Sequence, residues 1–121
     1  SGGEKQRVII ASALAQAADL MLLDEPTASL DLGYQIEIAS LVRQLNRERG
    51  VTMVIATHDL NFAAGVCTEL ALLCKGRVVA SGAAESVLTR EAIGALYGIE
   101  ADVGRHPVTG RLVVVPIRKA S

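Results

Sequence analysis

The sequence predicts an α/β protein in which parallel strands are flanked by helices, and three observations favour this fold class. Short apolar runs alternate with longer segments of helical periodicity, in the order strand, helix, strand, helix, strand. Polar, chemically active side chains directly follow two of the apolar runs. Half of the 121 residues are hydrophobic, which suits one domain with a real core.

The composition excludes several classes of function. The net charge is −1 with acids and bases interspersed, whereas a nucleic-acid-binding protein needs a basic patch or stripe. Cys67 and Cys74 fit no metal-ligand spacing, so we expect buried free thiols in a reducing compartment. The chain shows no signal peptide, and its longest apolar stretch, Val8 to Leu23, is interrupted and too short for a spanning helix. These features predict neither a secreted nor a membrane-spanning protein.

The run Leu20 to Leu23 is the strand around which the chain is organised. Four apolar residues bounded by polar ones predict a strand buried on both faces, and Pro26 ends it because proline has no N–H for the ladder. Asp24 and Glu25 follow at its carboxyl end, where α/β sheets bind their ligands. Neighbouring strand residues point to opposite sides, so one acid could hold a metal while the other faces a nucleophile.

The first segment predicts a capped helix that could hold an anion. Ser1-Gly2-Gly3-Glu4 has the form of a capping box, and the Ala-rich run to Ala18 follows it. The free N–H groups of a helix start attract phosphate, and two glycines allow a close approach. Taken alone this signal is weak, and an ordinary capped helix is the simpler interpretation.

The remaining elements follow in order. After the polar loop 27–31, a helix is expected over 33–49 with the buried stripe Ile38, Leu41, Val42 and Leu45, and Gly50 ends it. A second buried strand over 51–56 ends at Thr57-His58-Asp59. The later elements are a helix over 60–66, strands over 70–74 and 78–80, helices over 85–88 and 90–97, and strands over 99–103 and 112–115. Because parallel strands end at one edge of a sheet, we expect Asp24, Glu25 and His58 to meet there.

Together these motifs resemble the C-terminal half of an ABC transporter ATPase. Ser1 to Arg7 resembles the family's signature sequence, and Leu20 to Glu25 resembles its Walker B strand with the catalytic glutamate. Ser29-Leu30-Asp31 resembles the D-loop of the family, and His58 matches its switch histidine. The fold implied is a partial P-loop NTPase fold over residues 1–98, with a small C-terminal hairpin over 99–121. The sub-family that looks most similar imports iron chelates, haem or cobalamin. The sequence segments that show this similarity are Thr57-His58-Asp59-Leu60-Asn61, Pro26 to Gly33 and Gly76 to Gly82.

The resemblance implies a role for each motif. Asp24 would hold Mg²⁺, mostly through water, as a hard cation prefers. Glu25 would polarise the attacking water, and His58 would bond the γ-phosphate of ATP. The signature residues Ser1, Gly2, Gly3 and Glu4 would close over a nucleotide held by a second copy, and Ser29, Leu30 and Asp31 would lie at the same interface. Asp31 could equally cap the following helix, and Asp59 is expected to cap the next.

The sequence lacks the loop G-x-x-x-x-G-K-[ST] that cradles the phosphates of ATP. Its three lysines, Lys5, Lys75 and Lys119, do not follow such glycines. We therefore expect the full-length parent to hydrolyse ATP, and these residues alone to turn over none. The resemblance also implies a head-to-tail homodimer on the cytoplasmic face of the inner membrane, bound to permease subunits and indirectly to a substrate-binding protein.

Two other functions fit part of this pattern. A DNA-repair or chromosome-organising ATPase of the same superfamily can carry a similar signature, but no sustained heptads accompany it here. A regulatory module that keeps the fold without the chemistry would not need Asp24, Glu25 and His58 together. Both alternatives are therefore weaker than the transporter ATPase.

Overall fold

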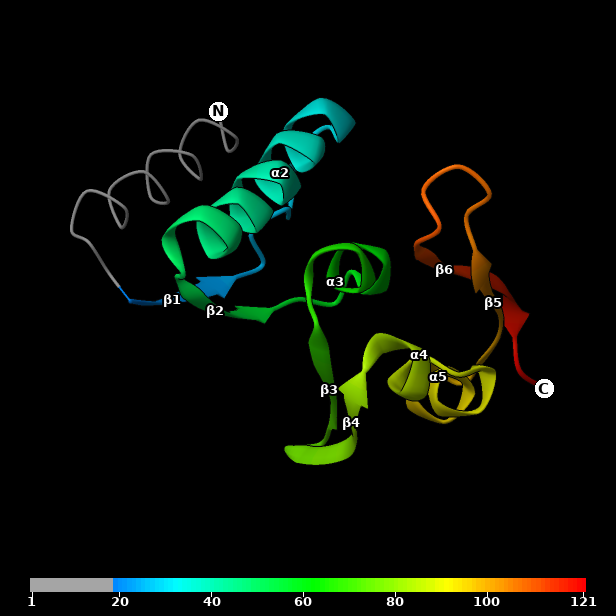
Figure 1. Cartoon of the computed structure of the whole chain (residues 1–121). Coiled ribbons are helices and arrows are strands. Elements are labelled where there is room, and N and C mark those ends of the chain that lie inside the picture. The colour runs from blue at the N-terminus through cyan, green and yellow to red at the C-terminus, as the bar shows by residue number, and fades with distance from the viewer. Residues whose placement is uncertain (1–18) are drawn as a thin grey trace. The chain divides into compact units, whose positions relative to one another are not determined.

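The computed structural model describes residues 19–121, so the predicted helix over 1–18 lies outside the described residues. The chain divides into two compact units, one up to His58 and the other from Asp59 to Ser121. Figure 1 shows the helices and strands of both units.

The first unit is a parallel strand pair joined by a long helix. β1 (Leu20–Asp24) pairs with β2 (Thr52–Ala56) in parallel, in a register that sets Leu20 beside Thr52 and Asp24 beside Ala56. The chain between them forms α2 (Leu32–Arg49), because parallel strands need a crossover connection. The register brings both carboxyl ends to one level, as the sequence predicts.

Helix α2 begins and ends at the positions that its capping residues dictate. Asp31 is the N-cap, and its carboxylate accepts a hydrogen bond from the Tyr34 amide at 2.9 Å. Gly50 ends the helix with φ of 66°, a left-handed conformation that glycine adopts without steric cost. Three members of the predicted apolar stripe are buried, while the fourth, Leu41, is half-buried; the buried ones are Ile38, Val42 and Leu45.

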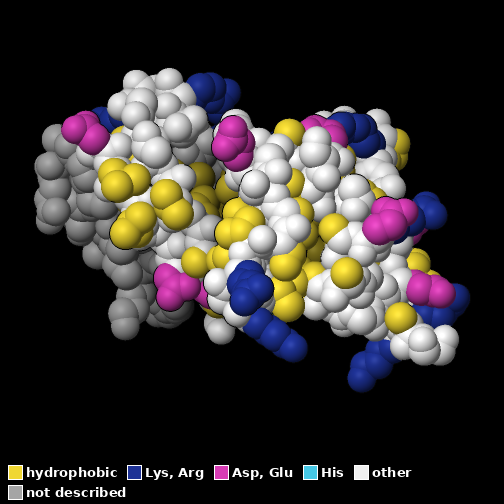
Figure 2. All heavy atoms as spheres, turned by 90° about the horizontal axis from the view of Figure 1, so that it is seen from below, with side chains coloured by type: hydrophobic (Ala, Val, Ile, Leu, Met, Phe, Trp, Pro, Cys, Tyr) yellow, Lys and Arg dark blue, Asp and Glu magenta, His cyan; other side chains and the backbone are white. Residues whose placement is uncertain are grey.

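The strand pair is buried on one face only, so the prediction that β1 is covered on both faces is wrong. Met21 and Leu23 are buried, whereas Leu20 and Leu22, on the opposite face, are 56% and 75% exposed. Val54 of β2, opposite Leu22, is 56% exposed. Exposed hydrophobic side chains are visible from below, the side on which β1 and β2 lie (Figure 2). The exposure of these three side chains shows that no layer covers the outer face of the two strands in the described part of the chain.

The second unit contains two antiparallel hairpins and three short helices. α3 (Leu60–Val66) leads into the hairpin of β3 (Glu69–Cys74) and β4 (Arg77–Ala83). α4 (Ala84–Val87) and α5 (Arg90–Tyr97) come next, and β5 (Ile99–Arg105) pairs with β6 (Leu112–Lys119). The third strand predicted from the sequence therefore pairs antiparallel with β4, and parallel pairing in the described residues is limited to β1 and β2.

One hydrophobic core holds the second unit together. Its buried members come from both hairpins, from α4 and the residue after it, and from α5: Leu72, Val87, Leu88, Ile93, Ala101 and Val114. Cys67 and Cys74 are free thiols here, half-buried rather than fully buried, and burial raises the pKa of Cys67. The described helices include none that is long and apolar enough to cross a membrane.

The side chain of Asn61 joins α3 to the backbone of β6. Its amide nitrogen donates to the Val114 carbonyl at 3.2 Å, and its amide oxygen accepts from the Val114 N–H at 2.7 Å. The pair of bonds imitates the contact that a neighbouring strand would make with β6. Asn61 therefore attaches the C-terminal hairpin to the helix that follows His58 in the chain.

Replacing Asn61 with alanine should loosen the C-terminal hairpin. The change removes two hydrogen bonds, each of about 1 kcal/mol, and leaves the Val114 N–H without its acceptor. Amide hydrogen exchange followed by NMR should therefore show faster exchange at Val114, by roughly tenfold or more. Asn46→Ala is the matched control, because the Asn46 amide bonds the Val51 carbonyl in the first unit. Equal exchange rates at Val114 in the two variants would contradict this role of Asn61.

Candidate active site

Glu25 lies one residue beyond the end of β1 and has an unusual backbone conformation. Its backbone φ is 47°, a value that residues other than glycine rarely adopt. Its N–H donates to the Ala56 carbonyl at 2.7 Å, so the parallel pairing of β1 with β2 continues to this residue. The left-handed turn follows directly, with the Ala28 N–H bonded to the Glu25 carbonyl at 3.2 Å. Strained conformations of this kind are concentrated at functional sites.

The carboxylate of Glu25 is held by two consecutive residues after β2. Its Oε1 accepts a hydrogen bond from the His58 N–H at 3.0 Å and lies 2.7 Å from Nδ1 of the same residue. Its Oε2 accepts from the Thr57 hydroxyl at 3.2 Å. The side chain of Glu25 is 33% exposed and that of His58 is 81% exposed. The predicted meeting of an acid and a histidine at the carboxyl edge of the strands is therefore confirmed.

These contacts favour the ionised form of Glu25. The hydrogen bond from the His58 side chain has the largest effect and lowers the pKa of Glu25 below its ordinary value. Desolvation acts in the opposite direction, and the hydrogen bonds from the Thr57 hydroxyl and the His58 backbone lower the pKa further. At neutral pH Glu25 is thus a carboxylate that can accept a proton from a bound water molecule.

Asp24, the predicted metal-holding residue, is the last residue of β1 and is exposed. The described residues contain no cluster of three or more histidine, cysteine or acidic side chains that could hold a metal ion by itself. A single exposed carboxylate still fits Mg²⁺, because this ion keeps several waters and takes its other ligands from phosphates. The metal role of Asp24 remains a prediction.

The segment from Ser29 to Asp31 forms a tight loop before α2. Ser29 has φ of 62°, Leu30 is buried, and Asp31 caps α2 as the sequence allowed. The Gln35 side chain donates to the Leu30 carbonyl at 3.0 Å, which ties the loop to the first turn of the helix. The loop is therefore rigidly attached to α2, while its predicted contact with a second copy stays a prediction.

The structure gives different outcomes for the predicted site residues. Glu25 and His58 are in contact, Asp24 lies beside Glu25 in the chain, and Ser29 to Asp31 follow on the next loop. Ser1, Gly2, Gly3 and Glu4 lie outside the described residues. Sequence reasoning missed Thr57, although its place between the end of a strand and the predicted histidine was a usable signal.

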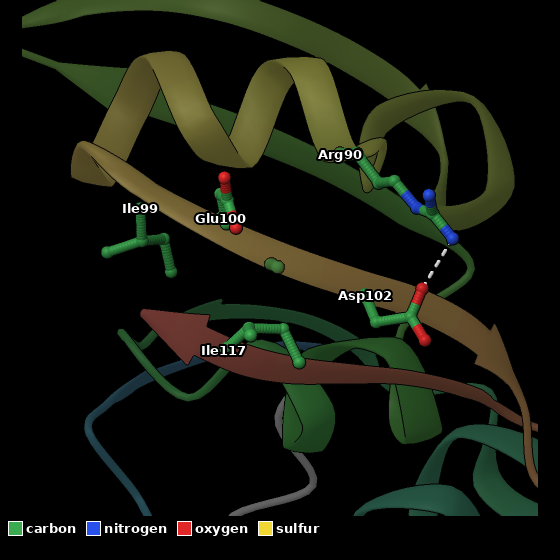
Figure 3. A pocket seen from close by; sticks show the side chains of 6 residues that line it. Arg90, Ile99, Glu100, Asp102 and Ile117 are labelled. Carbon is green, nitrogen blue, oxygen red and sulfur yellow. Dashed lines mark hydrogen bonds and ion pairs between the residues drawn. The ribbon is translucent and has the colours of Figure 1, made fainter. Parts of the chain in front are cut away.

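A hollow in the second unit contains none of these residues. It has a volume of about 450 Å³ and lies between α5 and the hairpin of β5 and β6 (Figure 3). Its lining residues are Arg90, Ile99, Glu100, Ala101, Asp102 and Ile117. The charged groups there already have partners, because Arg90 bonds Asp102 at 2.5 Å and Glu100 bonds Arg118 at 2.7 Å. We therefore place the candidate active site at Glu25 and His58.

The parallel strand pair, its crossover helix and the acid and histidine at the strand ends define the class of the protein: the chain is part of a P-loop NTPase fold. A solved structure described as an inward-facing metal-chelate type ABC transporter matches 97% of the chain with a TM-score of 0.86 and 32% identity, over 48% of its own chain.

The sequence comparisons identify the family. Residues 1–28 match the family model described as ABC transporter. The cobalamin import ATP-binding protein BtuD of Halobacterium salinarum is 49% identical over 97% of the chain, and the ferric enterobactin transport ATP-binding protein FepC of Escherichia coli is 42% identical over 100%. The chain belongs to the ATP-binding domains of ABC transporters. It spans 29% and 45% of the lengths of these two relatives.

Replacing His58 with alanine should raise the pKa of Glu25 towards its ordinary value of 4.5, because the main stabilising hydrogen bond to the carboxylate is lost. The midpoint can be measured by NMR titration of the Glu25 carboxyl carbon. A lowered folded-state pKa contributes stability at neutral pH that is lost as the pH falls through that pKa, so this contribution should shrink in the variant. His106→Ala, in the turn between β5 and β6, is the control, and an unchanged Glu25 midpoint in His58→Ala would contradict the assignment.

Proposed function

We propose that this chain is the C-terminal part of the ATP-hydrolysing subunit of an ABC importer. The single observation that carries the proposal is the contact between Glu25 and His58 at the carboxyl ends of β1 and β2. It sets a carboxylate and an imidazole side by side where a nucleotide would bind in this fold. The similarity to import ATP-binding proteins supports the same activity.

In this proposal each residue has a separate task. Glu25 accepts the proton of the attacking water, for which its ionised form is required. His58 donates a hydrogen bond to the γ-phosphate, and its contact with Glu25 keeps acceptor and donor in line. Asp24 would hold Mg²⁺, which neutralises charge on the phosphates. Ser1, Gly2, Gly3 and Glu4 would bind the γ-phosphate of ATP held by a second copy, with Ser29, Leu30 and Asp31 at that interface.

The chain alone should not complete the reaction. It has no lysine-containing glycine loop for the phosphates, and phosphoryl transfer depends on such positioning. The bare face formed by Leu20, Leu22 and Val54 supports this view, since parallel sheets are normally covered on both faces. A longer protein of this family would cover that face and supply the cradle.

The proposed setting is a membrane importer. We infer a head-to-tail homodimer bound to permease subunits at the cytoplasmic face of the inner membrane, served indirectly by a substrate-binding protein. The cargo class that the resemblance implies is an iron chelate, haem or cobalamin, and the names of the similar proteins support iron chelates and cobalamin. Neither a DNA-repair ATPase nor a regulatory module gains support from them.

We also retain the proposed division of the chain into residues 1–98 and a terminal hairpin over 99–121. Ala101 and Val114 of the hairpin lie in the core of the second unit, beside Ile93 of α5. The hairpin is therefore proposed as an extension that packs on the cassette rather than as an independent domain.

The change Glu25→Gln in the full-length polypeptide should abolish ATP hydrolysis while leaving ATP binding intact. The amide has nearly the same shape but cannot take the proton of water, and general-base catalysis is worth on the order of 10²–10⁴-fold. Phosphate release and equilibrium binding of labelled ATP are the measurements. Glu48→Gln, at an exposed acid of α2, should behave as wild type. A Glu25→Gln variant that hydrolyses ATP at the wild-type rate would refute the assignment.

The isolated 121 residues should release no phosphate from Mg-ATP above the buffer rate. The full-length polypeptide, assayed in parallel, is the positive control for the same reagents. Hydrolysis by the isolated chain would show that the glycine loop is not needed.

With its permease subunits in vesicles, the full-length protein should support uptake of an iron chelate, haem or cobalamin, and uptake of none of them would remove the cargo assignment.

A further inference from the structure

We propose that Thr57 is a positioning residue for ATP hydrolysis, which sets the orientation of the Glu25 carboxylate through a hydrogen bond to Oε2. The proposal rests on the function proposed above, since it concerns the base of that reaction. The supporting geometry is the division of donors between the two carboxylate oxygens. His58 bonds Oε1 through its backbone N–H and its ring Nδ1, while the Thr57 hydroxyl donates to the opposite oxygen, Oε2, at 3.2 Å.

The need for a second anchor follows from the freedom of a glutamate side chain. The final torsion of glutamate is broad and roughly two-fold, so the side chain's own torsional preference does not fix the plane of the carboxylate. A base must direct a lone pair at the proton that it removes. With Oε1 bonded to His58 and Oε2 bonded to Thr57, the plane of the carboxylate is defined.

The backbone places Thr57 where only a short hydroxyl side chain is needed. Glu25 donates its N–H to the carbonyl of Ala56, the residue directly before Thr57. The left-handed turn at Glu25 then directs the chain away from the strand pair. The carboxylate thus stays beside the two residues that follow β2, and Thr57 reaches it without a long, flexible side chain. Because Glu25 is about one third exposed, water has access to the carboxylate, and Thr57 controls its orientation rather than its access.

The test uses the full-length polypeptide and two substitutions that separate the hydroxyl from the methyl group. Thr57→Val keeps the shape and removes the hydroxyl, and Thr57→Ser keeps the hydroxyl and removes the methyl. We expect Thr57→Val to lower kcat by roughly ten- to a hundredfold, as suits one hydrogen bond to a charged group, with KM for ATP unchanged. Thr57→Ser should keep kcat within about twofold of wild type. A purely structural role would affect both variants, or would change KM with kcat.

Matched controls keep the outcomes separate. Thr52→Val makes the same change at an exposed position of β2 and should leave kcat unchanged. If Glu25→Gln is inactive but Thr57→Val hydrolyses ATP like wild type, the Thr57 proposal fails and the proposed function stands. If Glu25→Gln is fully active, the proposed function fails first. If Thr57→Val is misfolded and no longer binds ATP, Thr57→Ala is used in its place. In that case a Thr57→Ser variant with a kcat as low as that of Thr57→Ala would refute the proposal.

Discussion

The continuation of parallel pairing one residue past the end of β1 is the constraint on which the candidate site depends. The Glu25 N–H bonds the Ala56 carbonyl, and this bond fixes where the chain leaves the strand pair. From that point the next two residues after β2 face the Glu25 side chain and supply its hydrogen bonds. A shift of one residue in the register would separate Glu25 from His58, because the pairing of β1 with β2 sets the two strand ends at one level.

Local signals predicted the elements whose ends are determined by their own residues. Helices α3 and α5 occupy the predicted residues, since Asp59 and Thr89 accept hydrogen bonds from the amides that start them and Gly98 ends the second. The contact between Glu25 and His58 was also predicted, because parallel pairing brings the two strand ends to one edge. Each of these features depends on interactions within a few residues or on one pairing rule.

Sequence reasoning failed where the outcome depends on a partner distant in the chain. An apolar run such as Leu20 to Leu23 has the same pattern whether one face or two are covered, and the structure covers only the face of Met21 and Leu23. The strand from Glu69 was grouped with the parallel strands, although the tight turn that the sequence predicts at Lys75 and Gly76 gives it an antiparallel partner in β4. Thr57 was missed because its role requires the carboxylate 32 residues earlier.

The positions of Glu25 and His58 explain how an ionised acid and an exposed imidazole are kept together. The Glu25 side chain keeps about one third of its surface exposed, and the hydrogen bonds that lower its pKa outweigh the desolvation that raises it. His58 contributes its backbone as well as its ring, so part of the contact is independent of the protonation state of the imidazole. The backbone bond can therefore hold the carboxylate in place in either protonation state of the ring.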